Sequence, residues 1–252
     1  MRVARIRVRA DVTSFRHPFF VTGRQLGFDM PPPSTIHGHC ASALGHWPDP
    51  ETFFFGYHFA WKSRGHDLEH QHLASSLGPK AKTFVDTPGG RERATTEISI
   101  QPVWRDFLFG CVLDLYVAPD FATAFRSPVY PVVLGRSQDL AEVESVDEVE
   151  LVKTDRAVLQ NTILPRSFRP AVRFGTTVLL TRHISQPPER NATFAQYIWL
   201  KEPVFRGAGP GEPRAFVESS EIQLADLWTD PTVLDVAGFP RGVYLHKLID
   251  HQ

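Results

Sequence analysis

The chain has 252 residues, with 27 Lys and Arg against 28 Asp and Glu, so its formal net charge at pH 7 is −1. This length is enough to bury a substantial core, and the balanced charge excludes an overall electrostatic footprint for nucleic acid, so any such surface must be local. The two cysteines, Cys40 and Cys111, do not make a disulfide framework and suit a reducing cytosol. The apolar run at 107–118 is too short to span a bilayer and contains Asp114. We therefore expect a soluble, cytoplasmic protein with no membrane partner.

Residues 2–12 alternate between apolar and basic side chains, which predicts a β-strand. One face carries Ile6, Val8, Ala10 and Val12, and the other carries Arg5, Arg7 and Arg9. Two interpretations of the arginine face stay open: it holds phosphate groups, or its charges protect an exposed edge strand from aggregation.

A helix is predicted over about 35–44, directly after three prolines and Ser34. We expect Ser34 to cap the helix N-terminus, where backbone N–H groups and the helix dipole favour an anion. Gly38 inside the helix costs about 1 kcal/mol relative to alanine, which indicates close approach of another backbone. The segments 14–20 and 23–25 bring basic residues toward this helix start, so a phosphate backbone is the expected ligand.

Residues 52–61 are predicted as a second strand with a row of aromatic side chains on one face. That row is Phe53, Phe55, Tyr57, Phe59 and Trp61. Aromatic rows on a sheet can stack bases, but packing against the first helix as part of the core is the favoured interpretation.

Residues 66–104 are interpreted as an insertion between strands. The segment 86–90 is a strong turn signal, and lysines and arginines flank it. We expect a long hairpin whose basic tip carries Phe84 and Val85, and a plain surface loop is the alternative.

A further strand at 107–117 and a short helix at 119–125 complete a recognisable order. Strand, helix, strand, insertion, strand, helix, strand is compatible with an α+β, ferredoxin-like βαββαβ unit. More strands are expected at 176–181, 192–200 and 215–218. We therefore expect a main domain at 1–155 with its insertion at about 66–104, and a β-rich C-terminal extension at 156–252 packed on it.

Four short motifs follow one another along the chain, and their order is the informative feature. They are the run 14–20, the Pro-Pro-Ser-Thr-Ile-His-Gly helix start at 32–38, the Ala-Ser-Ala-Leu-Gly helix end at 41–45, and Leu-Gly-Arg-Ser at 134–137. Together they resemble the Cas-five family of CRISPR-associated RAMP proteins, which serve as subunits of type I Cascade complexes, with most likeness to type I-B. The resemblance is strongest over residues 1–140. It implies an RRM-like fold with a thumb hairpin, and a non-catalytic role in binding and capping the 5′ handle of the guide RNA (crRNA).

This resemblance implies three groups of RNA-binding residues. Near the helix start they are Ser14, Phe15, Arg16, Arg24, Ser34, Thr35 and His37. The thumb would contribute Lys80, Lys82, Arg91 and Arg93. Arg136 would support the handle after the second helix. Separately from the resemblance, the segment 161–188 has arginines and no acid, which makes Arg166 a further RNA-binding candidate, with a solvated loop surface as the alternative.

The resemblance also implies partners. They are the crRNA, a Cas-seven backbone subunit reached by the thumb, a large Cascade subunit, a Cas-six nuclease indirectly, and target DNA through the complex. No cofactor is expected. Whether such a complex serves interference or an RNA-guided transposon stays open.

Two other functions remain as alternatives. One branch of the family cleaves precursor guide RNA without metal, and His37, His39 and Tyr57 could supply general acid–base groups for a metal-independent endoribonuclease. The insertion lacks an adjacent Lys-His pair, however, so we expect binding rather than catalysis. The other alternative is a protein-interaction scaffold without RNA preference.

A metal site is also considered for the insertion. His66, His70 and His72 are close enough in sequence to share an ion on a helix or turn, and Asp67 and Glu69 supply carboxylates. Their spacing matches no strong zinc pattern, so no metal is expected.

Overall fold

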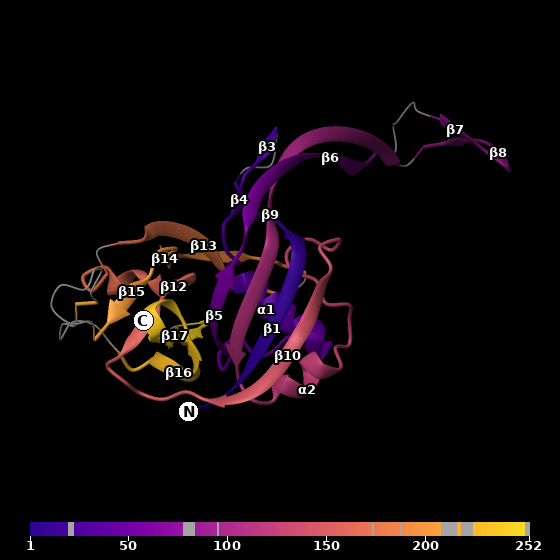
Figure 1. Ribbon diagram of the computed structural model, residues 1–252. Coiled ribbons are helices and arrows are strands. Elements are labelled where there is room, and N and C mark those ends of the chain that lie inside the picture. Colours follow the sequence, from indigo (N-terminus) through magenta and orange to yellow (C-terminus); the bar gives the residue numbers. More distant parts are fainter. Residues whose placement is uncertain are drawn as a thin grey trace.

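The structure is a computed structural model that describes residues 1–19, 23–77, 84–94, 96–172, 174–186, 188–207, 216–217 and 224–249. Its main sheet has the order β10-β1-β9-β5-β18 (Figure 1). The strands and helices that build its first part are β1 (Arg2–Thr13), α1 (Pro33–Leu44), β5 (Phe54–Ala60), β9 (Thr96–Val117), α2 (Phe121–Arg126) and β10 (Ala141–Glu150). Within the described part of the chain, no helix combines the length and apolar character of a bilayer-spanning segment.

The chain order β1-α1-β5-β9-α2-β10 and the spatial order β10-β1-β9-β5, all antiparallel, are those of a ferredoxin-like βαββαβ unit. The predicted α+β fold is therefore confirmed. β1 pairs with β10 on one side and with β9 on the other. The interpretation of β1 as an edge strand protected by its charges was wrong, because both of its edges are hydrogen-bonded.

The insertion is a long two-stranded ribbon that rises out of the body of the molecule (Figure 1). β6 (Ser63–Ser76) pairs with the outer half of β9, and a small hairpin of β7 (Phe84–Thr87) and β8 (Gly90–Arg93) follows beyond it. The hairpin prediction is confirmed, and the plain-loop alternative is wrong for β6 and its partner strand. The strand predicted at 107–117 is longer than expected, because β9 runs from the thumb into the main sheet.

Three short strands lie at the base of the thumb. β2 (Phe15–Arg16) pairs with β4 (Gly27–Phe28), and β3 (Arg24–Gln25) runs parallel to β9. The β2–β4 pairing holds the segment of Arg16 beside the start of α1, whereas β3 places Arg24 against β9 at the base of the thumb.

The C-terminal residues form further strands and two short 3-10 turns, as the prediction of a β-rich extension requires. They are β11 (Ala157–Leu159), β12 (Thr162–Pro165), η1 (Arg166–Phe168), β13 (Thr176–Ile184), β14 (Ala192–Leu200), β15 (Val204–Arg206), β16 (Leu227–Leu234), η2 (Val236–Gly238), β17 (Pro240–Tyr244) and β18 (His246–Lys247). They make a sheet of order β15-β11-β17-β16 and another of order β12-β14-β13, while β18 pairs with β5. Of the strand predicted at 215–218, only Phe216 and Val217 are described, and neither lies in a strand.

The aromatic row of β5 is core. Phe53, Phe55, Tyr57 and Phe59 are buried in one cluster with Ile36 and other residues of α1. Base stacking on these four rings is therefore ruled out, because the protein itself covers them, while Trp61 at the end of the row is only partly buried. Gly38 of α1 has no close backbone neighbour, since the nearest atom to an added Cβ would be the Trp47 ring at 4.0 Å. The close-approach interpretation of Gly38 was wrong.

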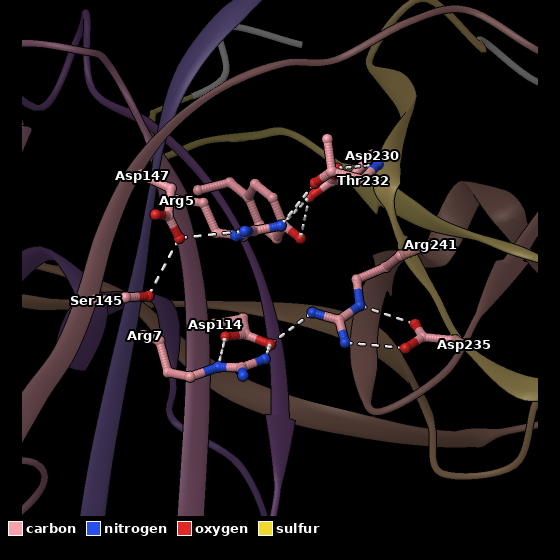
Figure 2. Close-up of polar contacts among 10 residues, drawn as sticks. Arg5, Arg7, Asp114, Ser145, Asp147, Asp230, Thr232, Asp235 and Arg241 are labelled. Carbon is pink, nitrogen blue, oxygen red and sulfur yellow. Dashed lines mark hydrogen bonds and ion pairs between the residues drawn. The ribbon is translucent and has the colours of Figure 1, made fainter.

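Arg5 and Arg7 of β1 bind carboxylates (Figure 2). Arg5 contacts Asp147 of β10 at 3.1 Å and Asp230 of β16 at 3.0 Å, and Arg7 contacts Asp114 of β9 at 2.7 Å. The Arg5–Asp230 pair joins the C-terminal strand β16 to the main sheet, and the other two pairs lie within that sheet. Arg5 and Arg7 are thus already paired with acids, which argues against the interpretation that this arginine face holds phosphate groups.

Candidate nucleic-acid interface

A cavity of about 380 Å³ opens where the start of α1 meets β2, the loop after α2 and β13. We call it the α1 cavity. Its lining residues are Ser14, Phe15, Arg16, Pro18, Pro32, Ser34, Thr35, Arg105, Gly135, Arg136, Thr181 and Ile184. It brings together six of the thirteen predicted site residues, from segments more than 100 positions apart: Ser14, Phe15, Arg16, Ser34, Thr35 and Arg136.

The loop that carries Arg136 is fixed against β1 by a glycine and a hydroxyl group. Gly135 has φ +102°, and a Cβ there would lie 2.6 Å from Oγ1 of Thr13 and 2.7 Å from the carbonyl oxygen of Ser14. The Thr13 hydroxyl donates to the carbonyl oxygen of Leu134. Only glycine suits this backbone and this close contact, which explains its place in the Leu-Gly-Arg-Ser motif.

Asp139 organises one wall of the α1 cavity from a buried position. Its carboxylate accepts hydrogen bonds from the backbone N–H of Ser14 and of Arg136, both at 3.1 Å. It also accepts from Nη2 of the Arg136 guanidinium at 2.8 Å. Burial alone would lower the pKa of Arg136, but the hydrogen bonds and charge of Asp139 outweigh it and raise that pKa. Arg136 is thus a fixed, permanently charged group at the cavity wall.

Arg16 and Arg105 play different parts in the same cavity. Arg105 is buried and bound to Glu69, whose Oε2 also lies 3.7 Å from Nη1 of Arg136. Arg16 is exposed, and among the described residues it has no carboxylate partner. Because a guanidinium without an acid is available to an external anion, Arg16 is the group best placed to bind one. Local sequence patterns did not single out Arg105, which lies just beyond the predicted end of the insertion.

The start of α1 differs from its prediction. The N-cap is Pro32, Pro33 is the first helical residue, and Ser34 makes no capping hydrogen bond. Capping by Ser34 was therefore wrong. The N–H groups of Thr35 and Ile36 both donate to the carbonyl oxygen of Pro32, at 2.9 and 3.2 Å. Since proline has no N–H, the amide of Ser34 is the first-turn donor left for the cavity in the described structure.

Other predicted site residues lie away from the α1 cavity. Arg24 contacts Asp106 at 3.2 Å at the base of the thumb. Arg91 and Arg93 are exposed on β8, with their guanidinium carbons 5.5 and 5.9 Å from the Phe84 ring centre. Arg166 donates to the side chain of Gln196. Lys80 and Lys82 lie outside the described residues.

His37 and Tyr57 are engaged inside the protein rather than at the cavity surface. Nε2 of His37 lies 2.9 Å from the carbonyl oxygen of Pro48, and the Tyr57 hydroxyl donates to the carbonyl oxygen of Pro31 at 3.0 Å. Both side chains are buried, and burial lowers the pKa of His37 and raises that of Tyr57. Neither group is presented to a substrate in the α1 cavity.

The histidines of the insertion lie on a strand, β6, and not on a helix or turn as considered from the sequence. His66 packs edge-on against Trp104, with ring centres 5.6 Å apart. The described residues contain no group of three or more His, Cys, Asp or Glu side chains that could hold a metal ion. Cys40 and Cys111 are buried free thiols, and burial raises the pKa of Cys111 to about 12.

The family model described as "CRISPR-associated protein (Cas_Cas5)" matches residues 4–201, which include every wall of the α1 cavity. The chain belongs to this family. The four motifs at 14–20, 32–38, 41–45 and 134–137 all lie inside the matched region.

Solved structures give distant likenesses to this Cas-five protein. A chain from a "CRISPR RNA-guided surveillance complex" is 16% identical with a TM-score of 0.47, covering 83% of this chain and 95% of that one. A CRISPR protein from Archaeoglobus fulgidus is 13% identical with a TM-score of 0.39, covering 97% and 99% of the two chains. No curated protein matches the sequence.

Proposed function

We propose that this Cas-five protein binds and caps the 5′ handle of a crRNA as a non-catalytic subunit of a type I CRISPR complex. The observation that carries the proposal is Arg16, exposed and without an acid partner at a cavity that also presents Ser34, Thr35 and Arg136. A phosphate of the handle would accept from the Arg16 guanidinium and from the Ser34 amide, which together supply charge and direction.

Arg136 has a positioning part in this proposal. Its guanidinium is already bound to Asp139 at 2.8 Å, so it contributes less free positive charge than Arg16. Because its orientation is already fixed, no conformational entropy of the Arg136 side chain has to be lost when a nucleotide binds.

The thumb would serve the assembly of the complex. β7 and β8 present Phe84, Val85, Arg91 and Arg93 as exposed side chains beyond the long β6–β9 ribbon. A surface that combines apolar and basic groups suits both a neighbouring subunit and RNA. We propose a Cas-seven backbone subunit and the large Cascade subunit as the protein partners, with target DNA and the Cas-six nuclease reached through the complex.

The test measures binding of the protein to the handle of the crRNA from its own CRISPR array over a range of salt concentrations. Arg16→Gln should weaken binding by about 1.5–3 kcal/mol, the usual value of a hydrogen bond to a charged group. It should also reduce the salt slope by about 0.7, the value for one phosphate contact on a single strand.

Arg2→Gln is the matched control, because Arg2 is an exposed arginine at the start of β1, whereas the α1 cavity lies beyond the end of that strand. If the wild-type protein shows no salt-dependent binding, or if both variants bind equally well, the proposal is wrong. RNA incubated with the protein in EDTA should be recovered intact, and cleavage that disappears in Tyr57→Phe would contradict the non-catalytic role.

A further inference from the structure

Two exposed phenylalanines stack on each other at the rim of the α1 cavity. The rings of Phe19 and Phe194 have centres 5.4 Å apart and planes inclined by 30°. Their residues are 61% and 36% exposed, so the pair leaves aromatic surface in contact with water. Exposed apolar groups that gather in this way often mark an interaction site.

The pair is continuous with the cavity through both of its strands. Pro18 lines the cavity and directly precedes Phe19. Thr181 also lines the cavity and is the cross-strand partner of Phe194 in the β13–β14 pairing. Since directly opposed residues have Cβ atoms about 5 Å apart, the Phe194 ring starts next to the cavity wall.

The rings continue inward from the pair. The His17 ring lies 5.5 Å from that of Phe19 and 4.7 Å from that of Phe28. Burial lowers the pKa of His17, so at neutral pH this imidazole adds aromatic surface rather than charge. Phe19 therefore belongs to a row of neighbouring rings that continues through His17 to Phe28.

We propose that Phe19 and Phe194 form a stacking platform for one unpaired base of the RNA whose phosphate is bound in the α1 cavity. The proposal rests on the proposed function and names a subsite for it. A cation without an acid partner beside an exposed aromatic surface matches the two parts of a single-stranded nucleotide, its phosphate and the face of its base. Because Arg16 lies nearby, the ligand of the Phe19–Phe194 pair is expected to carry an anion. This favours RNA over an apolar segment of a partner protein.

The test compares binding of a short oligoadenylate with that of an abasic chain of the same length, which has the same phosphates and no bases. The wild-type protein should prefer the oligoadenylate. In the double variant Phe19→Leu/Phe194→Leu this preference should fall by about 5- to 150-fold, the range for loss of a stacked base. Binding of the abasic chain and the salt slope should not change, because the phosphate contacts remain.

Two variants control for other effects. Phe19→Tyr/Phe194→Tyr keeps both rings and should keep the wild-type preference. Tyr130→Leu removes an exposed ring from the loop after α2, near the far end of α1, and should also keep it. Circular dichroism and thermal unfolding check that all variants are folded.

The outcomes separate this inference from the proposed function. If the preference for bases in the double leucine variant equals that of the wild type while salt-dependent binding persists, the platform is refuted and the proposed function stands. A partner protein would then be the occupant of the aromatic pair. If the wild-type protein binds neither chain in a salt-dependent manner, both proposals are wrong.

Discussion

Nη1 of Arg241 lies 2.6 Å from Oδ2 of Asp114, and this buried contact joins β17 to the central strand β9 (Figure 2). The same carboxylate accepts two hydrogen bonds from Arg7, at 2.7 and 2.9 Å. Arg241 in turn holds Asp235 through two bonds of 2.8 and 2.9 Å. Burial would raise the pKa of Asp114, but the two guanidinium groups outweigh it and keep that pKa below its ordinary value. The C-terminal strands are thus joined to the main sheet by a network of ion pairs in which the arginines and carboxylates share partners.

Replacement of Arg241 by leucine should destabilise the protein by about 3–5 kcal/mol, because it leaves buried carboxylates short of a partner. Chemical denaturation measures this loss as a lower midpoint. Arg2→Leu is the control, since the pair of Arg2 with Glu148 at 2.8 Å is exposed to solvent and should contribute no more than about 1 kcal/mol. Equal losses in the two variants would contradict the role assigned to the buried pair.

Buried histidines should make the protein lose stability as the pH falls below 6.5. Burial lowers the pKa of His246 to about 3, from an ordinary value of 6.5. The unfolded chain therefore binds a proton that the folded one does not between pH 6.5 and 3, so protonation favours unfolding there. At pH 5 this histidine alone should cost about 2 kcal/mol relative to neutral pH.

His39 and His58 should act in the same direction, because burial lowers the pKa of each to about 4. The measurement is the unfolding free energy against pH for the wild type and for His246→Gln, which should show a flatter fall. His70→Gln, on the exposed thumb strand, is the control. An identical pH profile in His246→Gln and wild type would show that His246 is not the neutral buried group described.

Local sequence patterns were enough to predict the central strands of the main sheet but not β10, β18 or the α1 cavity. The alternation around Ile6 and the aromatic row around Phe55 indicate burial of one strand face. They can therefore be interpreted correctly without knowing which strands pair with which. The acids that bind Arg5 and Arg7 stand more than 100 positions away, at Asp114, Asp147 and Asp230, and no local spacing reveals such pairs.

The helix start shows a second kind of limit. Side-chain capping preference points to Ser34, but Pro33 fits the first helical position, where its missing N–H costs nothing. The helix therefore begins two residues earlier than predicted, and Ser34 lies in its first turn and lines the cavity. Thr181 and Ile184 reach the same cavity from β13, through contacts that only the tertiary fold determines.

Gly135→Ala should damage the α1 cavity itself. The residue would be held at a φ of +102°, and its new methyl group would press on Thr13 and on the backbone of Ser14. We expect a stability loss of about 1–3 kcal/mol and weaker RNA binding, because the wall that carries Arg136 must move.

Gly90→Ala is the matched control for that variant. Its φ is +116°, yet a Cβ there meets no atom within 4 Å. It therefore carries the backbone strain without the crowding, far from the cavity on the thumb. RNA affinity that falls equally in both variants would mean that strain, and not contact with Ser14, explains the effect.

Gly38→Ala should have the opposite sign and stabilise the protein. An added Cβ would meet only the Trp47 ring at 4.0 Å, which is ordinary contact, and the residue lies inside α1. Alanine restricts the unfolded chain more than glycine does, so the unfolding free energy should rise by about 0.5–1 kcal/mol. Ala41→Gly on the same helix should lower it, and RNA binding should stay at the wild-type level because Gly38 does not line the cavity. A destabilised Gly38→Ala variant would instead mean that a neighbour packs closer to this helix than the structure shows.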